Sequence, residues 1–263
     1  MGQGSSRERK DAKAITKKSV QATKIERAKA TGILSLHACK LKNIPTDVFE
    51  ITKLNTLDLS NNSITEVPAI TQLVNLKTLK LDNNQLTSLP DLSPLTKLQN
   101  LVLDNNRIVT LNGLPASLTK LSARGNAMEE FPLCICYVPN LEVVDLGANA
   151  IANVPDTIAQ CTGLKELTLD NNQLTMLPAA LAECPKLAAL FVRNNRLGKT
   201  SISSAILAYS AIHIMQLEGN PMTKYDLEEM EGIEAFLERR KKLKDKEIHG
   251  GLSTDVSLCG LEH

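Results

Sequence analysis

The residue types that most often perform catalysis are scattered along this chain of 263 residues. Its four histidines are His37, His213, His249 and His263. None of them belongs to a recognisable motif for an activated serine or cysteine nucleophile, and no glycine-rich loop of the kind that binds phosphate is found. The sequence therefore predicts a protein that is not an enzyme, with no catalytic residue and no bound cofactor.

Two patterns resemble metal sites. Cys134 and Cys136 form a C-x-C pair, and a D-N-N triplet recurs at Asp82, Asp104 and Asp170. The cysteine pair lacks a second Cys or His cluster at the spacing of zinc ligands. The triplets lie a full repeat apart and lack the glycine of a calcium loop, so turn formation explains them better. We therefore predict no metal site.

The N-terminus carries a candidate lipidation site. Its first six residues fit the pattern M-G-x-x-x-S, in which Gly2 accepts a myristoyl chain once Met1 has been removed. Residues 1–30 contain nine Lys or Arg and three acidic residues, a net charge of +6. One acyl chain binds a bilayer weakly, but a basic segment beside it adds attraction to an anionic leaflet. We expect peripheral attachment to the cytosolic face of a membrane; the alternative is an unmodified, solvated arm.

A repeated apolar pattern predicts the framework. Between Thr31 and Met222 the motif L-x-x-L-x-L-x-x-N-x-L-x-x-L-P occurs nine times, and successive copies start 20 to 25 residues apart. Within L-x-L the period is two, so Leu57 and Leu59 are predicted to point inward and Asp58 outward. Such repeats stack as a leucine-rich repeat solenoid of the α/β class. We expect a curved parallel sheet on the concave side and irregular, 3-10 or helical segments on the convex side.

The asparagine of each repeat is predicted to be structural. Its amide can donate and accept hydrogen bonds at the inside of the turn, where the bend leaves backbone groups of adjacent coils unpaired. The resulting ladder is expected at Asn62, Asn84, Asn106, Asn126, Asn149, Asn172, Asn195 and Asn220.

Composition and pattern divide the chain into four parts. Residues 1–30 form a basic arm, flexible or helical; residues 31–223 form the repeats; residues 224–247 form a capping helix with a basic end; and residues 248–263 form a disordered tail. No apolar run reaches the length that crosses a bilayer, and no signal peptide is recognised, so we expect a cytoplasmic protein. The basic stretch at 238–246 lacks interleaved aromatic residues, so no nucleic-acid partner is expected.

Cys161 and Cys184 occupy the same position in consecutive repeats. Both stand three residues before an opening leucine, where other repeats have Leu or Val. We therefore expect small apolar fillers of the core. A disulfide between them is the alternative that this spacing leaves open.

The side chains between and beside the strand leucines are the predicted contact surface for a protein partner. Two features distinguish it: an acidic run through Asp58, Asp82 and Asp104, and an outward Phe191 beside Arg193, a pairing typical of interface anchors. The alternative is an ordinary solvated strand face. The predicted partner-binding residues are Asp58, Lys80, Asp82, Val102, Asp104, Arg124, Asp145, Asp170, Phe191 and Arg193.

The order of these features resembles that of small intracellular leucine-rich repeat proteins. The resemblance covers about residues 1–246 and rests on the M-G-x-x-x-S start, T-G-I-L-S-L at Thr31–Leu36, the L-P repeats, E-G-N-P-M at Glu218–Met222, and L-E-E-M-E-G at Leu227–Gly232 before a Lys-rich helix. It implies a membrane-associated protein more than an activity. The 22-residue rhythm from Leu54 to Leu98 is similar to phosphatase-regulatory and axonemal proteins of the same superfamily.

These observations lead to one expected function and one alternative. We expect a monomeric adaptor that is anchored through Gly2 and the basic arm and binds an unknown protein on its concave face, with an anionic membrane as second partner. The alternative is a soluble regulatory or structural subunit of a phosphatase, cytoskeletal or axonemal complex.

Overall fold

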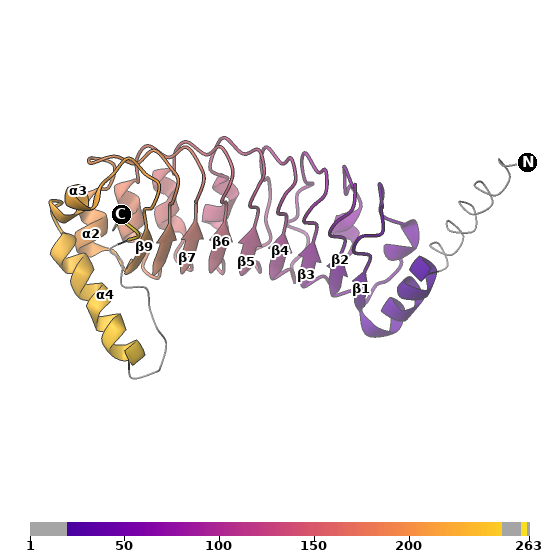
Figure 1. The fold of residues 1–263 in the computed structure, drawn as a ribbon. Coiled ribbons are helices and arrows are strands. Elements are labelled where there is room, and N and C mark those ends of the chain that lie inside the picture. The colour runs from indigo at the N-terminus through magenta and orange to yellow at the C-terminus, as the bar shows by residue number, and fades with distance from the viewer. Residues whose placement is uncertain (1–19, 249–258, 262–263) are drawn as a thin grey trace, which may run out of the picture.

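Nine short parallel strands form one sheet in the order in which they occur in the sequence (Figure 1). The structure, a computed structural model, describes residues 20–248 and 259–261. The predicted solenoid is confirmed. The strands are β1 Ile33–Ser35, β2 Thr56–Asp58, β3 Thr78–Lys80, β4 Asn100–Val102, β5 Lys120–Ser122, β6 Val143–Asp145, β7 Glu166–Thr168, β8 Ala189–Phe191 and β9 Ile214–Gln216.

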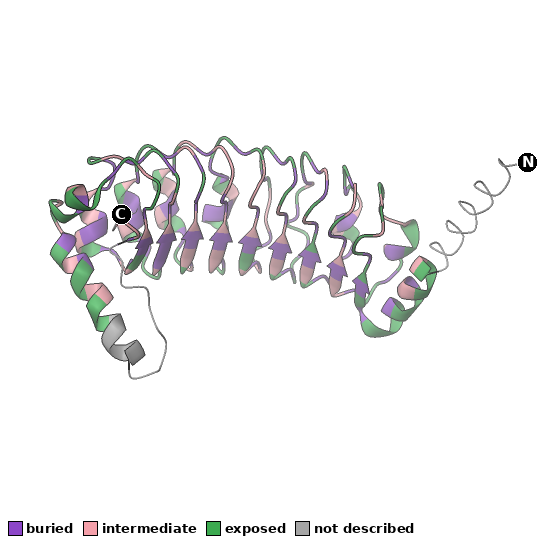
Figure 2. Ribbon diagram, in the orientation of Figure 1, coloured by how far each residue is buried: buried purple, intermediate pink, exposed green. Residues whose placement is uncertain are grey.

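The middle residue of each strand supplies the core. Leu57 of β2 pairs in register with Leu34 and Leu79, and each is at most 1% exposed. The two outer residues of a strand point to the opposite face, where most are half-buried or exposed (Figure 2). Because each coil buries its leucines only against its neighbours, the sheet grows by addition.

The return segments on the other side of the coil are short helices or extended chain. Pro45, Pro132, Pro155 and Pro178 immediately precede four of the 3-10 helices. Proline suits this position because its φ is fixed in the helical range and it has no N–H to leave unpaired. The 3-10 helices are η1 Thr46–Val48, η2 Ile70–Gln72, η3 Leu133–Tyr137, η4 Asp156–Gln160 and η5 Ala179–Glu183, and α2 Ser204–Tyr209 takes their place before β9.

A helix over residues 20–31 covers the N-terminal end of the solenoid. Ile25 and Ala28 are buried in the core, and the Ala28 carbonyl accepts a hydrogen bond from Gly32 N at 2.8 Å. The boundary predicted at residue 30 therefore differs from the structure, because residues 20–30 of the basic arm belong to the folded solenoid. Gly2 and the rest of residues 1–19 lie outside the described residues.

The C-terminal cap contains two helices instead of the single one predicted for residues 224–247. They are α3 Lys224–Glu228, which begins with a capping box between Thr223 and Asp226, and α4 Ile233–Ile248. Gly232 separates them with a φ of +89°, and a Cβ there would lie 2.8 Å from the backbone nitrogen of Ala208. Only glycine suits this close, left-handed turn, so the helix is interrupted.

Part of the predicted disordered tail is folded. Cys259 is 3% exposed, and its carbonyl accepts a hydrogen bond from Leu217 N at 2.9 Å, just after β9. The prediction of disorder is wrong for residues 259–261, because they use a backbone group that the last coil leaves unpaired. The rest of that segment beyond Ile248 lies outside the described residues.

All six cysteines are free thiols. Cys161 and Cys184 are at most 4% exposed, and Cys136 of the C-x-C pair is also buried. A hydrogen bond from Cys161 lowers the pKa of Cys136 to about 7. Within the described residues, no helix combines the length and hydrophobicity needed to cross a bilayer.

Candidate functional site

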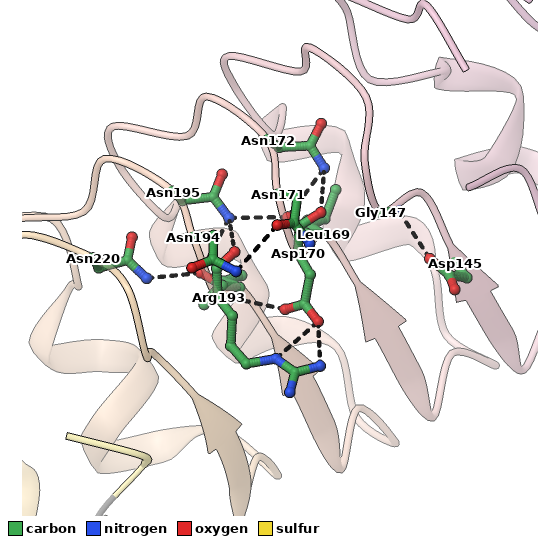
Figure 3. Close-up of polar contacts among 11 residues, drawn as sticks. Asp145, Gly147, Leu169, Asp170, Asn171, Asn172, Arg193, Asn194, Asn195 and Asn220 are labelled. Carbon is green, nitrogen blue, oxygen red and sulfur yellow. Dashed lines mark hydrogen bonds and ion pairs between the residues drawn. The ribbon is translucent and has the colours of Figure 1, made fainter. Parts of the chain in front are cut away.

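Each asparagine of the ladder joins two coils. Asn106 Nδ2 donates to the carbonyls of Leu81, in the preceding coil, and Leu103, in its own, at 3.0 and 2.9 Å. Its Oδ1 accepts from the Leu86 N–H of the preceding coil at 3.0 Å. The same pattern holds for Asn62, Asn84, Asn126, Asn149, Asn172, Asn195 and Asn220, the last three of which appear in Figure 3. Their role is to hold the strand face rigid.

The residue before the ladder asparagine adopts a left-handed conformation in most coils. The positions are Asn61, Asn83, Asn105, Gly125, Ala148, Asn171, Asn194 and Gly219, with φ between 52° and 72°. Asn and Gly tolerate this region, whereas alanine is strained there. The repeated D-N-N triplet carried this signal: its first asparagine makes the turn and its second enters the ladder.

The concave face consists of the outer residues of each strand and the residue two positions after it. In its first two coils, Asp58 is held by hydroxyl groups. Its Oδ1 accepts from the Ser60 hydroxyl at 2.5 Å and its Oδ2 from the Ser35 hydroxyl at 3.2 Å. Burial works to raise the pKa of Asp58, but these hydrogen bonds outweigh it and the pKa is lowered.

A histidine completes this group without forming a catalytic triad. His37 Nδ1 lies 2.8 Å from the Ser60 hydroxyl oxygen. In a triad the imidazole stands between the hydroxyl and the carboxylate, so that it can take the proton. Here Ser60 stands in the middle, is 5% exposed and gives its proton to Asp58. The arrangement fixes side chains and does not activate a nucleophile.

Asp104, Arg124 and Asp145 form the centre of the face. Asp104 Oδ1 accepts from the Ser122 hydroxyl at 2.6 Å and from Arg124 N at 2.9 Å. The Arg124 guanidinium extends over the next coil, where Gly147 leaves room: a Cβ on Gly147 would lie 2.4 Å from Nη1. Among the described residues, no hydrogen bond or ion pair holds that guanidinium.

Asp145 is half-buried beside Arg124. One of its oxygens accepts from Gly147 N at 2.8 Å (Figure 3). Burial raises the pKa of Asp145, and the neighbouring carboxylates Asp104 and Asp170 add to the rise. Arg124 and the Gly147 N–H act in the opposite direction but do not compensate.

Asp170 and Arg193 were predicted as contact residues, and the structure pairs them with each other. Asp170 is 2% exposed; its Oδ2 accepts from Arg193 Nε and Nη2 at 3.0 and 2.6 Å, and its Oδ1 from Arg193 N at 2.7 Å (Figure 3). The expectation that Asp170 contributes to the accessible surface is wrong, because the carboxylate ties two coils together. The pKa of Arg193 is raised by the same hydrogen bonds.

The other predicted residues differ in accessibility. Lys80 is exposed, whereas Asp82, Val102 and Phe191 are half-buried. The prediction also missed two apolar side chains, Ile33 and Ile214, which are 57% and 44% exposed at the two ends of the face. They occupy the first strand position, where most coils have a polar residue, and that contrast is visible in the sequence.

The geometry of the described concave face is that of a rigid surface. The part of the chain that the structure describes contains no group of three His, Cys, Asp or Glu residues that could hold a metal ion. What the face presents is a sheet-wide array of charged side chains with half-buried apolar residues between them.

Two family models match the repeats. The model described as "Leucine Rich repeats (2 copies)" matches residues 52–94 and 74–116, and "Leucine rich repeat" matches residues 139–197. A comparison with curated proteins found no match. Leucine-rich repeat domains generally mediate protein–protein interaction, and such proteins are typically non-enzymatic.

Solved structures show the same fold. A leucine-rich repeat protein of Leptospira interrogans is 29% identical, with a TM-score of 0.60 over 78% of this chain and 58% of its own. An internalin of Listeria monocytogenes is 25% identical, with a TM-score of 0.62 over 73% of this chain and 56% of its own.

A plant peptide hormone receptor in complex with the peptide RGF2 is similar at 27% identity, with a TM-score of 0.53 over 73% of this chain and 36% of its own. This chain thus spans less than two thirds of the length of each of these proteins. The nine-stranded coil, its asparagine ladder and the two family matches together identify the chain as a leucine-rich repeat protein.

Proposed function

We propose that this protein is a non-enzymatic adaptor that holds a protein partner against its concave face. The observation that carries the proposal is Arg124, whose guanidinium lies at the centre of a rigid face and is not held by any hydrogen bond or ion pair between described residues. Lys80 is an exposed cation on the same face, and Arg124 is half-buried. The helix over residues 20–31 and the helices α3 and α4 lie at the two ends of the solenoid (Figure 1).

Charge reversal at these positions tests the proposal. We expect the double variant Lys80→Glu and Arg124→Glu to bind a captured partner with an affinity lower by about tenfold or more. The reason is that charged side chains that pair with a partner across an interface contribute to specificity and affinity. Partners are identified by proximity labelling and their affinity is then measured with purified protein. The midpoint of thermal unfolding should stay the same for Lys80→Glu, whereas Arg124→Glu should lower it because the new carboxylate faces the half-buried Asp145, so binding is compared at a temperature at which both proteins are folded.

Arg193→Ala is the matched control for the measurement of stability. It leaves the carboxylate of Asp170 buried without its guanidinium partner, so it should lower stability. A partner that binds the double variant as tightly as wild type would refute the concave site.

A membrane anchor is the finer part of the proposal. Its support is the sequence alone: Gly2 in an M-G-x-x-x-S pattern, followed by the basic residues between Arg7 and Lys29, and an overall order of features that resembles leucine-rich repeat-containing protein 57. Location on the cytosolic face of a membrane is proposed on the same ground. Intact mass after expression with an N-myristoyltransferase should show one myristoyl group. The Gly2→Ala variant should move to the soluble fraction, and an unmodified Gly2 would refute the anchor.

The alternative is a soluble subunit of a phosphatase, cytoskeletal or axonemal complex. It is favoured by the regular 22-residue spacing of Leu54, Leu76 and Leu98. Fractionation separates the two proposals, because a soluble subunit leaves the membrane fraction empty and elutes in a large complex whether or not Gly2 is replaced.

A further inference from the structure

A hollow of about 640 Å³ lies outside the concave face, between the return segments of two adjacent coils. It is lined by residues 109–113, which follow β4, and by residues 129–134 and 137, which follow β5.

A difference in coil length creates the hollow. Leu98 and Leu118 open successive repeats only 20 residues apart, which is the shortest spacing in the array. That coil has no helix between β4 and β5, whereas the next coil has η3 after Pro132. The thinner coil therefore lies beside a thicker one, and the step between them is open.

Exposed apolar side chains gather around this step. Val109 is 58% exposed, Leu133 50% and Tyr137 67%, while Phe131 beneath them is 5% exposed. Single exposed apolar residues are ordinary on a monomer, but a contiguous group around a concave site indicates an interaction surface.

The charge around the hollow has one sign. Glu129 and Glu130 are exposed in its lining, which includes no Lys or Arg. Within the described residues neither carboxylate takes part in an ion pair. An occupant with apolar side chains and nearby positive charge would complement both properties.

We infer that this hollow binds a segment of a partner protein in which an aliphatic or aromatic side chain stands next to Lys or Arg residues. The apolar side chain packs between Val109, Leu133 and Tyr137, and the cations pair with Glu129 and Glu130. This surface is separate from the concave face, so the protein can hold two partners at once.

Selection of peptides from a random phage-displayed library against the full-length protein tests the inference. We expect enriched peptides that combine an aliphatic or aromatic residue with Lys or Arg. Their synthetic forms, measured by fluorescence polarisation, should bind about tenfold more weakly to the Leu133→Ser and Tyr137→Ser double variant. The Glu129→Lys and Glu130→Lys double variant should weaken binding similarly, and added salt should weaken binding to the wild type.

Two controls keep the outcomes distinct. Met176→Ser changes an exposed apolar side chain in a different hollow and should leave binding unchanged. Lys80→Glu should also have no effect, so failure here is independent of the concave site. The inference is overturned if no peptide is enriched, if enriched peptides lack basic residues, or if they bind the hollow variants as well as wild type. Self-association of the wild type that Tyr137→Ser abolishes would assign the hollow to a second copy and also overturn it.

Discussion

At the scale of single residues, the asparagine ladder carries the largest predicted effect. Asn106→Ala leaves the buried N–H of Leu86 without a partner, whereas the carbonyls of Leu81 and Leu103 lose one amide donor each and keep a second, from Asn84 and Asn126. An unsatisfied buried group costs about 1–3 kcal/mol, so we expect the free energy of unfolding to fall by about that amount. Urea unfolding monitored by circular dichroism measures it. The exposed Asn112→Ala should change stability by less than about 0.5 kcal/mol; equal effects of the two substitutions would contradict a structural ladder.

Ala148 occupies the turn position that asparagine or glycine fills in seven other coils and Ala38 fills in the first coil. Its φ of 52° strains an alanine side chain. We expect Ala148→Gly to raise the free energy of unfolding by about 0.5–1 kcal/mol, since relief of strain exceeds the added flexibility of the unfolded chain. Ala152→Gly, at a position without positive φ, should instead lower stability. Thermal unfolding of both variants checks the contrast, and a destabilised Ala148→Gly would show that the turn is not strained.

Asp145 predicts a dependence of stability on pH. Because burial raises its folded-state pKa, the carboxylate opposes folding once it is charged. That cost is absent below the ordinary value of 3.8 and grows as the pH rises through the raised pKa. Asp145→Asn should therefore stabilise the protein at pH 7 and have little effect near pH 3.8, as measured by urea unfolding across this range.

Asp58 predicts a dependence of stability on pH that is opposite to that of Asp145. Burial works to raise its pKa but hydrogen bonds from Ser60 and Ser35 outweigh it, so the charged form stabilises the fold above pH 3.8. This contribution disappears as the pH falls through the lowered pKa. Asp58→Asn should then destabilise the protein at pH 7 and matter less in acid. The same pH trend in both variants would contradict these assignments.

At the scale of elements, the C-terminal cap depends on Arg239 of α4. Its guanidinium donates to the carbonyls of Leu207 and Ala208 in α2 and of Ile212, at 2.5, 3.1 and 3.0 Å. Arg239→Ala should therefore destabilise the cap by about 2 kcal/mol. The exposed Lys241→Ala should be neutral, and Arg239→Lys should recover only part of the loss because lysine lacks the planar fork. Hydrogen exchange of α2 amides measures the local effect; unchanged exchange in Arg239→Ala would contradict it.

The strands were predictable because their signal is local and repeated. Two leucines spaced two residues apart and an asparagine at a fixed distance specify each coil, and the neighbouring repeats have the same sequence pattern. The ends carry no such repetition. The helix over residues 20–31, the break at Gly232 and the packing of Cys259 depend on contacts with the terminal coils, which no single segment encodes.

For the candidate site, the sequence predicted the positions of the side chains but not their contacts. The strand pattern correctly indicated which side chains leave the core, but not which of them pair with each other. Asp104 and Asp170 have the same place in the repeat and both accept from a backbone N–H of the next coil. Arg193 folds back onto Asp170, whereas Arg124 extends over Gly147. The equivalent residue of the following coil differs, being Gly147 beside Arg124 and Glu218 beside Arg193, and the strand pattern alone does not specify that contact.

At the scale of the whole molecule, the solenoid separates two surfaces. The concave face is formed by the nine strands and carries Lys80 and Arg124, whereas the hollow beside η3 lies among the return segments. Because the buried leucines of each coil lie between its strand and its return segment, a substitution of an exposed side chain on one surface should leave the other intact. Partners of the two surfaces should therefore respond to different variants.

Lysine footprinting of the protein with its captured partner tests the central claim most directly. Lys80 is exposed on the concave face, and Lys97, whose ammonium donates to Asn75 Oδ1, lies outside it. We expect the partner to slow acetylation of Lys80 several-fold and to leave Lys97 unchanged. Protection of Lys97 with Lys80 still reactive would place the partner elsewhere and contradict a concave binding site.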